Sequence, residues 1–346
     1  MPDPLAMNLP VRITTALLVG AAFVIAVALP LAVLRADEPL KIRLGWIGVP
    51  GSWGPPVDEK KDLAKHRGTS YTLELSRLAG TSPMITALAA GELDIAPLSF
   101  SAFGLAVENG GLTDLRIIAD EIEDGYEDYY TTEFLVRKDG PIKTIEDLKG
   151  KTLATNAIGG ATDMAMRVML RRSHLEEKKD YTIVETQLGN MKAFLIDGKA
   201  DLIAPSPNFV DADLRGISRS LFTQKDAFGL TQFTAWYARA PFIAKNRAAL
   251  VDFMEDYLRA IRWWLDPANH AEAAEILARL TKTPPASLGW AYTKQDWHHD
   301  RDGQPKLDAM QHNLELQKEL GFLKGNIDVK SHADLSMVEE AALRLK

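Results

Sequence analysis

The segment Asn156–Thr162 has the composition of an anion-binding turn. A strand-like stretch, Lys151–Thr155, ends at this segment, and a helical pattern begins at Thr162. Gly159 and Gly160 allow a close backbone approach between the two. Free N–H groups at a helix start bind anions and carboxylates, so we predict ligand contacts here. The alternative is that the glycines only make the turn. The predicted contacts are Asn156, Gly160, Ala161 and Thr162.

Hydroxyl side chains occupy comparable positions in an earlier part of the chain. Thr81 and Ser82 precede a helical pattern, with Ser82 suited to the cap and Pro83 to the first turn. A second hydroxyl group follows a buried apolar strand, and α/β folds bind ligands at the carboxyl ends of strands. We predict ligand contacts through Thr81, Ser82, Ser99, Phe100 and Ser101. Phe100 has an alternative place in the core.

Two tryptophans, Trp46 and Trp53, flank a loop rich in Gly and Pro that includes Gly48. Their rings could stack on a flat or apolar ligand, or pack beside a hinge. Later loops at equivalent positions add weaker polar candidates. These are Gln187, Ser206 and Asn208.

Residues 120–133 are acidic and rich in tyrosine. Such a run usually forms a solvated face, and that is the interpretation we favour. The alternative is that the segment lines a ligand cleft and favours a cationic ligand. The neighbouring His298 and His299 lack the spacing of a chelating pair, and the chain has no cysteine. We therefore predict no catalytic residue, no metal and no cofactor.

A repeated segment indicates the elements that position these residues. Gly91-Glu92-Leu93-Asp94 recurs as Gly198-Lys199-Ala200-Asp201, and each copy follows a strand, a loop and a helical stretch. This is one βαβ unit used twice at domain-sized spacing. Two similar α/β lobes with matched loops predict a cleft between them, which is a common place for a small ligand.

Strands alternate with helices in two blocks, followed by a mostly helical region from Pro241. The pattern predicts an α/β fold of two doubly wound lobes joined by a hinge of two crossovers, near Val136 and Trp236. Lobe 1 comprises 37–137 and 237–346, and lobe 2 comprises 138–236.

The N-terminal 36 residues have the pattern of a secretory signal. Arg12 precedes an apolar run from Ile13 to Leu34, and Ala36 offers a cleavage position. The run is long enough to be an uncleaved membrane anchor instead. The formal net charge of −7 argues against a nucleic-acid partner. The secretory pattern of the first 36 residues predicts a periplasmic protein.

Three segments resemble a known family. Lys143–Leu153 is similar to a segment of type II periplasmic binding proteins. The two Gly-x-x-Asp stops and the tail Asp334–Ala341 are similar to the nitrate/sulfonate/taurine class, whose fold is shared with thiamine-pyrimidine precursor synthases. The resemblance covers essentially residues 40–346.

The resemblance implies a monomeric solute-binding protein that delivers a small organic ligand, such as a sulfonate or carboxylate, to the membrane subunits of an ABC permease. One alternative is a secreted sensor subunit that binds a similar solute. Another is an enzyme of the pyrimidine-precursor kind. That enzyme class uses a cysteine-rich motif, which this cysteine-free chain lacks. Ligand identity and charge stay open at this point.

Overall fold

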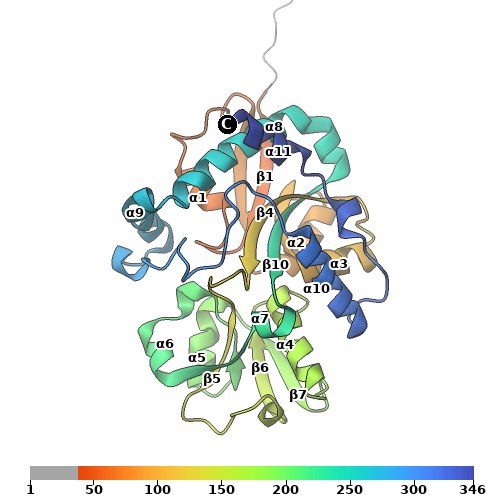
Figure 1. Ribbon diagram of the computed structural model, residues 1–346, viewed down its shortest axis with the longest axis vertical. Coiled ribbons are helices and arrows are strands. Elements are labelled where there is room, and N and C mark those ends of the chain that lie inside the picture. The colour runs from red at the N-terminus through yellow and green to blue at the C-terminus, as the bar shows by residue number, and fades with distance from the viewer. Residues whose placement is uncertain (1–37) are drawn as a thin grey trace, which may run out of the picture. The chain divides into compact units, whose positions relative to one another are not determined.

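A computed structural model describes residues 38–346 (Figure 1). The predicted signal segment, residues 1–36, lies outside the described residues. Within 38–346, no helix is both long and apolar enough to cross a lipid bilayer.

The first lobe is built on a five-stranded sheet with the order β2-β1-β3-β10-β4. Its strands are β1 (Leu40–Trp46), β2 (Tyr71–Arg77), β3 (Ile95–Ser99), β4 (Leu115–Asp124) and β10 (Thr231–Arg239). β1 pairs in parallel with β2 and β3, whereas β10 runs antiparallel to both β3 and β4.

The second lobe repeats this plan in the order β7-β6-β8-β5-β9. Its strands are β5 (Glu133–Arg137), β6 (Lys151–Thr155), β7 (Tyr181–Glu185), β8 (Leu202–Ile203) and β9 (Ser218–Thr223). β6 is parallel to β7 and β8, and β5 is antiparallel to its two neighbours. The predicted pair of α/β lobes is confirmed.

Helices cover both sheets, and those from residue 240 onward form the predicted helical C-terminal region (Figure 1). The α-helices are α1 (Gly54–Glu59), α2 (Thr81–Ala89), α3 (Phe100–Glu108), α4 (Ala161–Arg172), α5 (Met191–Ile196), α6 (Ala212–Ile217), α7 (Gln224–Phe228), α8 (Ala240–Trp264), α9 (His270–Thr281), α10 (Leu307–Glu319) and α11 (Ser336–Arg344). The short 3₁₀ helices are η1 (Glu146–Leu148), η2 (Leu188–Asn190), η3 (Pro207–Phe209), η4 (Pro267–Asn269), η5 (Pro285–Ser287) and η6 (Val329–His332).

The repeated aspartate has the same structural role in both lobes. Asp94 accepts a hydrogen bond from the backbone N–H of Arg43 at 2.9 Å, and its own N–H donates to the Arg43 carbonyl at 2.8 Å. Asp201 makes the same two bonds with Thr152, at 3.0 and 2.7 Å. The side chain thus fastens the start of β3 to β1 in the first lobe and the start of β8 to β6 in the second.

The crossovers lie a few residues before the predicted points. Val136 is inside β5, which belongs wholly to the second sheet, and Trp236 is inside β10, which belongs wholly to the first. The chain therefore crosses between the lobes through residues 125–132 and 224–230. The prediction was displaced because these two apolar strands do not reveal in sequence which sheet they join. The division into mobile lobes stays a prediction.

The hydrophobic core continues across the boundary between the lobes. One cluster contains Phe103 of the first lobe, Met164 of the second and Phe228 of a crossover. The Phe100 and Phe228 rings meet edge to face, with centroids 5.0 Å apart. Aromatic burial of this kind favours the closed arrangement of the lobes seen here.

Candidate ligand site between the lobes

We call the predicted ligand residues Thr81, Ser82 and Ser99–Ser101 the first wall and Asn156–Thr162 the second wall. The two walls touch each other. Ser82 Oγ on α2 donates to the Ile158 carbonyl at 2.9 Å, and Ser101 Oγ on α3 donates to the Gly159 carbonyl at 3.0 Å. Two segments that lie far apart in the sequence, 82–101 and 158–159, are therefore in contact, at the positions where we predicted ligand residues.

A chain of hydroxyls lies within the first wall. Thr81 Oγ1 is 3.1 Å from Ser99 Oγ, which is 2.9 Å from Ser101 Oγ. Ser99 Oγ also caps α3 by accepting from the Ala102 N–H at 3.1 Å. These three side chains are buried, so each hydroxyl is oriented by its neighbours.

Two helix N-termini meet across the boundary, and neither has a side-chain cap. Gly80 occupies the cap position of α2, and Gly160 occupies that of α4. The two helix starts are close: a Cβ placed on Gly80 would lie 2.8 Å from Ala157 Cβ, and one on Gly160 would lie 3.8 Å from Thr81 Oγ1. Each N-terminus carries partial positive charge, so the site is suited to an anion between them.

The second wall differs from the sequence prediction in one respect. The N–H groups of Ile158 and Gly159 are not available to a ligand, because Glu185 and Asp163 carboxylates accept them at 2.6 and 2.8 Å. The turn directs carbonyls, not N–H groups, at the first lobe. The backbone donors left for a ligand belong to the first turn of α4, at Ala161 and Thr162, which Gly160 leaves without a side-chain cap.

Sequence reasoning missed two polar residues that are fully buried near this boundary. Thr155 ends β6, and its Oγ1 has no hydrogen-bond partner among the described residues. Gln224 begins α7 in the second crossover, and neither of its amide atoms has such a partner. Unpaired buried polar atoms are costly, which indicates a place for water or a ligand. Only Thr155 had a signal, as the last residue of a strand before the turn.

Two predicted ligand residues are core residues instead. Trp53 is 0% exposed, stacks on Tyr292 with centroids 5.0 Å apart and meets the edge of His299. Phe100 is also 0% exposed and packs against Phe228. Their ring faces are occupied by protein side chains, so neither is placed to stack on a ligand.

The remaining predicted residues lie outside the contact between the walls. The Arg77 guanidinium lies 5.4 Å from the Trp46 ring, while Gly48 lies in an open turn. Ser206 Oγ donates to Asn208 Oδ1 at 2.6 Å within one loop. The exposed Gln187, like these two, has no hydrogen bond to the first lobe among the described residues. Their role at the ligand stays a prediction.

The acidic segment is not a solvated face over its first half. Asp120, Glu121, Glu123 and Asp124 belong to β4 and are at most 1% exposed. The C-terminal residues 292–306 cover this strand; for example, Glu123 and His298 form a backbone bridge. The favoured interpretation was wrong there, because the acids are paired with partners that lie far away in the sequence.

Burial changes the protonation of this region. It raises the pKa of Glu121 to about 7, although Trp236 Nε1 donates to this carboxyl at 3.2 Å. It also raises the pKa of Asp296 to about 7. The buried His299 imidazole has its pKa lowered to about 4 by the same cause, and it hydrogen-bonds the Glu121 carbonyl. These groups are therefore largely neutral in mildly acidic solution.

We expect Glu121 and Asp296 to make the free energy of unfolding fall as pH rises from about 4.5 to about 7, partly offset by His299, whose lowered pKa acts in the opposite direction. In the unfolded chain Glu121 and Asp296 ionise near their ordinary pKa, so the folded chain holds more protons in this interval. Urea unfolding at several pH values measures the slope. Glu121→Gln, which keeps an acceptor for Trp236, should reduce it, whereas the exposed control Glu92→Gln should not. An unchanged slope in Glu121→Gln would contradict this assignment.

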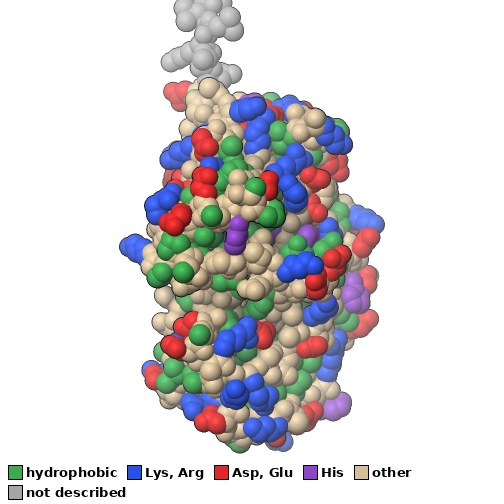
Figure 2. Space-filling view, turned by 60° about the vertical axis from the view of Figure 1, so that its left-hand side comes forward, with side chains coloured by type: hydrophobic (Ala, Val, Ile, Leu, Met, Phe, Trp, Pro, Cys, Tyr) green, Lys and Arg blue, Asp and Glu red, His purple; other side chains and the backbone are tan. Residues whose placement is uncertain are grey.

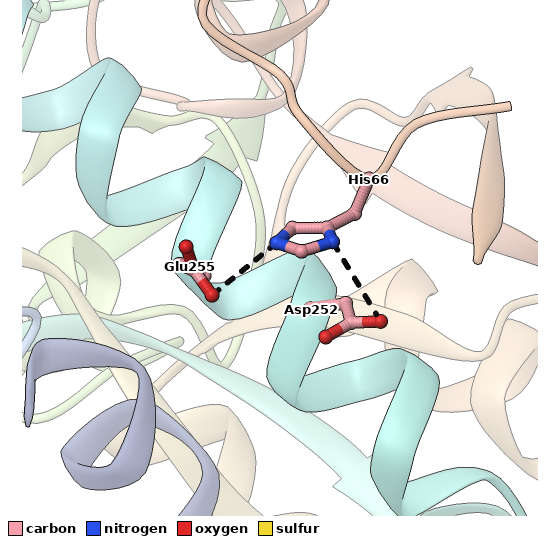
Figure 3. Close-up of side chains that lie close together, drawn as sticks. All are labelled: His66, Asp252 and Glu255. Atoms are coloured by element: carbon pink, nitrogen blue, oxygen red, sulfur yellow. Dashed lines mark ion pairs between the residues drawn. The ribbon is translucent and has the colours of Figure 1, made fainter. Parts of the chain in front are cut away.

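One cluster has the side-chain types of a metal site. His66, Asp252 and Glu255 bring ligand atoms within 4.8 Å of one another (Figure 3). Its carboxylates are already paired with cations: Arg344 lies 2.9 Å from Asp252 Oδ1, and Arg259 contacts Glu255. A guanidinium on each carboxylate disfavours an added cation, so the arrangement is better described as an ion-pair network that fastens α11 and α8 to the loop before β2.

Two surface hollows lie away from the walls. One of about 360 Å³ is lined by the end of α2 and by Asp114 and Arg239, and one of about 330 Å³ lies beside α10. Acidic and basic side chains are mixed over the face that Figure 2 shows, without a basic stripe. That face has no feature expected of a nucleic-acid interface.

Comparison with known proteins agrees with this architecture. Residues 122–271 match the family described as NMT1/THI5 like. The structure is similar to the alkanesulfonate-binding protein SsuA from Xanthomonas axonopodis pv. citri bound to MOPS, with a TM-score of 0.68, 18% identity, and coverage of 87% of this chain and 100% of that one.

Two further structures share the fold. One is the periplasmic nitrate-binding protein NrtA from Synechocystis PCC 6803, with a TM-score of 0.68, 17% identity, and coverage of 89% and 90%. The other is the desulfurization enzyme DSZB, with a TM-score of 0.62, 12% identity, and coverage of 89% and 100%. Both binding proteins and an enzyme therefore use this architecture, as the chain's resemblance implied. The chain carries an NMT1/THI5-like segment on the two-lobed fold of the sulfonate- and nitrate-binding periplasmic proteins.

Proposed function

We propose that this protein binds a small organic anion, a sulfonate or carboxylate, between its lobes and delivers it to an ABC importer. The observation that carries the proposal is the meeting of two uncapped helix N-termini, α2 and α4, beside the hydroxyls of Thr81, Ser99 and Ser101. Each helix N-terminus attracts an anion through its partial positive charge, although Asp163 in the first turn of α4 offsets part of that charge. Hydroxyl and backbone donors can hold a charged oxygen without a guanidinium.

The walls are in direct contact, so a ligand can enter only after the lobes separate. Ligand contacts to both walls would then favour closure over the open state. The two crossovers, residues 125–132 and 224–230, are the segments about which such a motion would occur. The geometry therefore favours a protein that encloses its ligand rather than one that binds it on an open surface.

Export to the periplasm, a monomeric state and transfer to permease subunits are parts of the same proposal. They draw support from the sequence pattern of residues 1–36 and from the periplasmic proteins that share the fold. A sensor subunit that binds the same solute would use the same site. The enzyme alternative draws support only from the likeness to DSZB, and the chain has no cysteine for thiol chemistry. We propose a non-enzymatic role without a metal or cofactor.

A binding screen tests the proposal. We expect ethanesulfonate or propionate to raise the melting temperature of residues 38–346, since a ligand at 100 times its Kd adds about 2.7 kcal/mol of stability. Propanol, which has an apolar body but no charge, should have no effect. Thr81→Val, which removes one hydroxyl at constant volume, should weaken binding of the best anion severalfold. Stabilisation by propanol equal to that by the anions would contradict an anion site.

A further inference from the structure

Carboxylates hold the turn that faces the first lobe, residues 156–160, which we call the interlobe turn. Asp163 Oδ2 accepts from the Gly159 N–H at 2.8 Å, and Glu185 Oε1 accepts from the Ile158 N–H at 2.6 Å. Gly159 has a φ of 81°, a left-handed conformation that favours glycine. With both N–H groups held from behind, the carbonyls of the same residues are free to accept from Ser82 and Ser101.

Asp163 is itself fixed in place by a second row of charges. Its Oδ2 also accepts from Arg167 Nε at 2.9 Å, and Arg167 reaches Glu177 at 2.5 Å. Asp163 is 1% exposed, and its Oδ1 has no partner among the described residues. Two carboxylates share the Arg167 guanidinium, and Lys178 also acts on Glu177. Burial of this carboxyl raises its pKa, opposed by the Arg167 charge.

We propose that Asp163 is a positioning residue of the interlobe site, which fixes the interlobe turn with its carbonyls toward the first lobe and sets the charge of the anion that is accepted. The selection of anion charge, but not the positioning of the turn, rests on the proposed function. Asp163 lies in the first turn of α4, where its charge offsets the positive end of that helix. The site should therefore prefer a singly charged anion, such as a sulfonate or a monocarboxylate, to a doubly charged one.

Two substitutions separate the positioning effect from the charge effect. Asp163→Asn keeps an oxygen that can accept from Gly159 and Arg167 but removes the charge. Asp163→Ala removes both. Asp197→Asn, an exposed change on the same lobe away from the turn, is the matched control for charge alone.

The first measurement needs no ligand. Amide hydrogen exchange of the interlobe turn should be at least about tenfold faster in Asp163→Ala than in wild type, because Gly159 N–H loses its acceptor. Asp163→Asn should restore exchange to nearly the wild-type rate, a rescue that a general loss of packing would not show. Equal rates in wild type and Asp163→Ala would overturn the positioning role.

The second measurement compares calorimetric titrations with sulfate and ethanesulfonate. The ratio of sulfate to ethanesulfonate affinity should rise about threefold in both Asp163 variants, as expected for loss of one partly screened charge. It should stay at the wild-type value in Asp197→Asn. An unchanged ratio in both Asp163 variants would overturn the charge selection. Failure of wild type to bind either anion would instead refute the proposed function, and the exchange measurement would still decide the positioning role.

Discussion

Gly80→Val should weaken ethanesulfonate binding at least about tenfold, or about 1.4 kcal/mol, with little change in the melting temperature of the ligand-free protein. A Cβ at Gly80 would lie 2.8 Å from Ala157 Cβ and 3.2 Å from Asn156 Nδ2, both on the opposite lobe. These separations are too short for contact, so the valine should hold the lobes apart. The backbone φ of 179° is extended and suits a β-branched residue.

The matched control for Gly80→Val is Gly289→Val, where a Cβ would meet nothing within 4 Å. It should bind as wild type does. Calorimetric titration gives the affinities, and small-angle scattering should show a larger radius of gyration for ligand-free Gly80→Val only. Equal affinities for wild type and Gly80→Val would mean that the lobes need not close at this contact for the ligand to bind.

Asp124→Ala is expected to have the largest effect on stability, roughly 3 kcal/mol or more. This carboxylate is 0% exposed at the end of β4. It accepts from Thr131 Oγ1, from the N–H and Oγ1 of Thr132, and from Trp297 Nε1, at 2.5 to 3.1 Å. Removing the acceptor leaves these donors unpaired where the first crossover meets the C-terminal region.

Urea unfolding measures the effect of Asp124→Ala. The control is Asp128→Ala, four residues later and exposed, which loses only a surface ion pair with Lys294 at 2.7 Å. Such a pair contributes about 0–1 kcal/mol. A loss in Asp124→Ala no greater than that in the control would show that this hydrogen-bonded group does not stabilise the crossover.

The sequence predicted the architecture well because the βαβ repeat has strong local signals. Gly91 and Gly198 both end their helices at a positive φ, of 68° and 66°. Each is followed by an aspartate that fastens strands of the same sheet. Such features depend on neighbours in the same unit, so a single sequence reveals them. Residues 58–67 also look helical in sequence, but α1 ends at Glu59 and turns follow.

The candidate site was predicted in part. The hydroxyls of the first lobe and the glycine turn of the second were found because they end strands and begin helices. The sequence could not reveal that the turn directs its carbonyls toward the first lobe. The Glu185 carboxylate, which accepts the Ile158 N–H, belongs to another strand. Burial of Asp120 to Asp124 was missed for the same reason, because residues 292–306 that cover them are distant in the sequence. Burial of Trp53 likewise depends on Tyr292.

Amide hydrogen exchange with and without saturating ethanesulfonate tests the central claim most directly, because it locates the ligand without any substitution. We predict slower exchange in both walls, residues 80–83, 99–102 and 156–163, together with the crossovers 125–132 and 224–230. The hollows lined by residues 88–94 and 311–328 should change little. Protection confined to one lobe, or centred on residues 311–328, would contradict a site between the lobes.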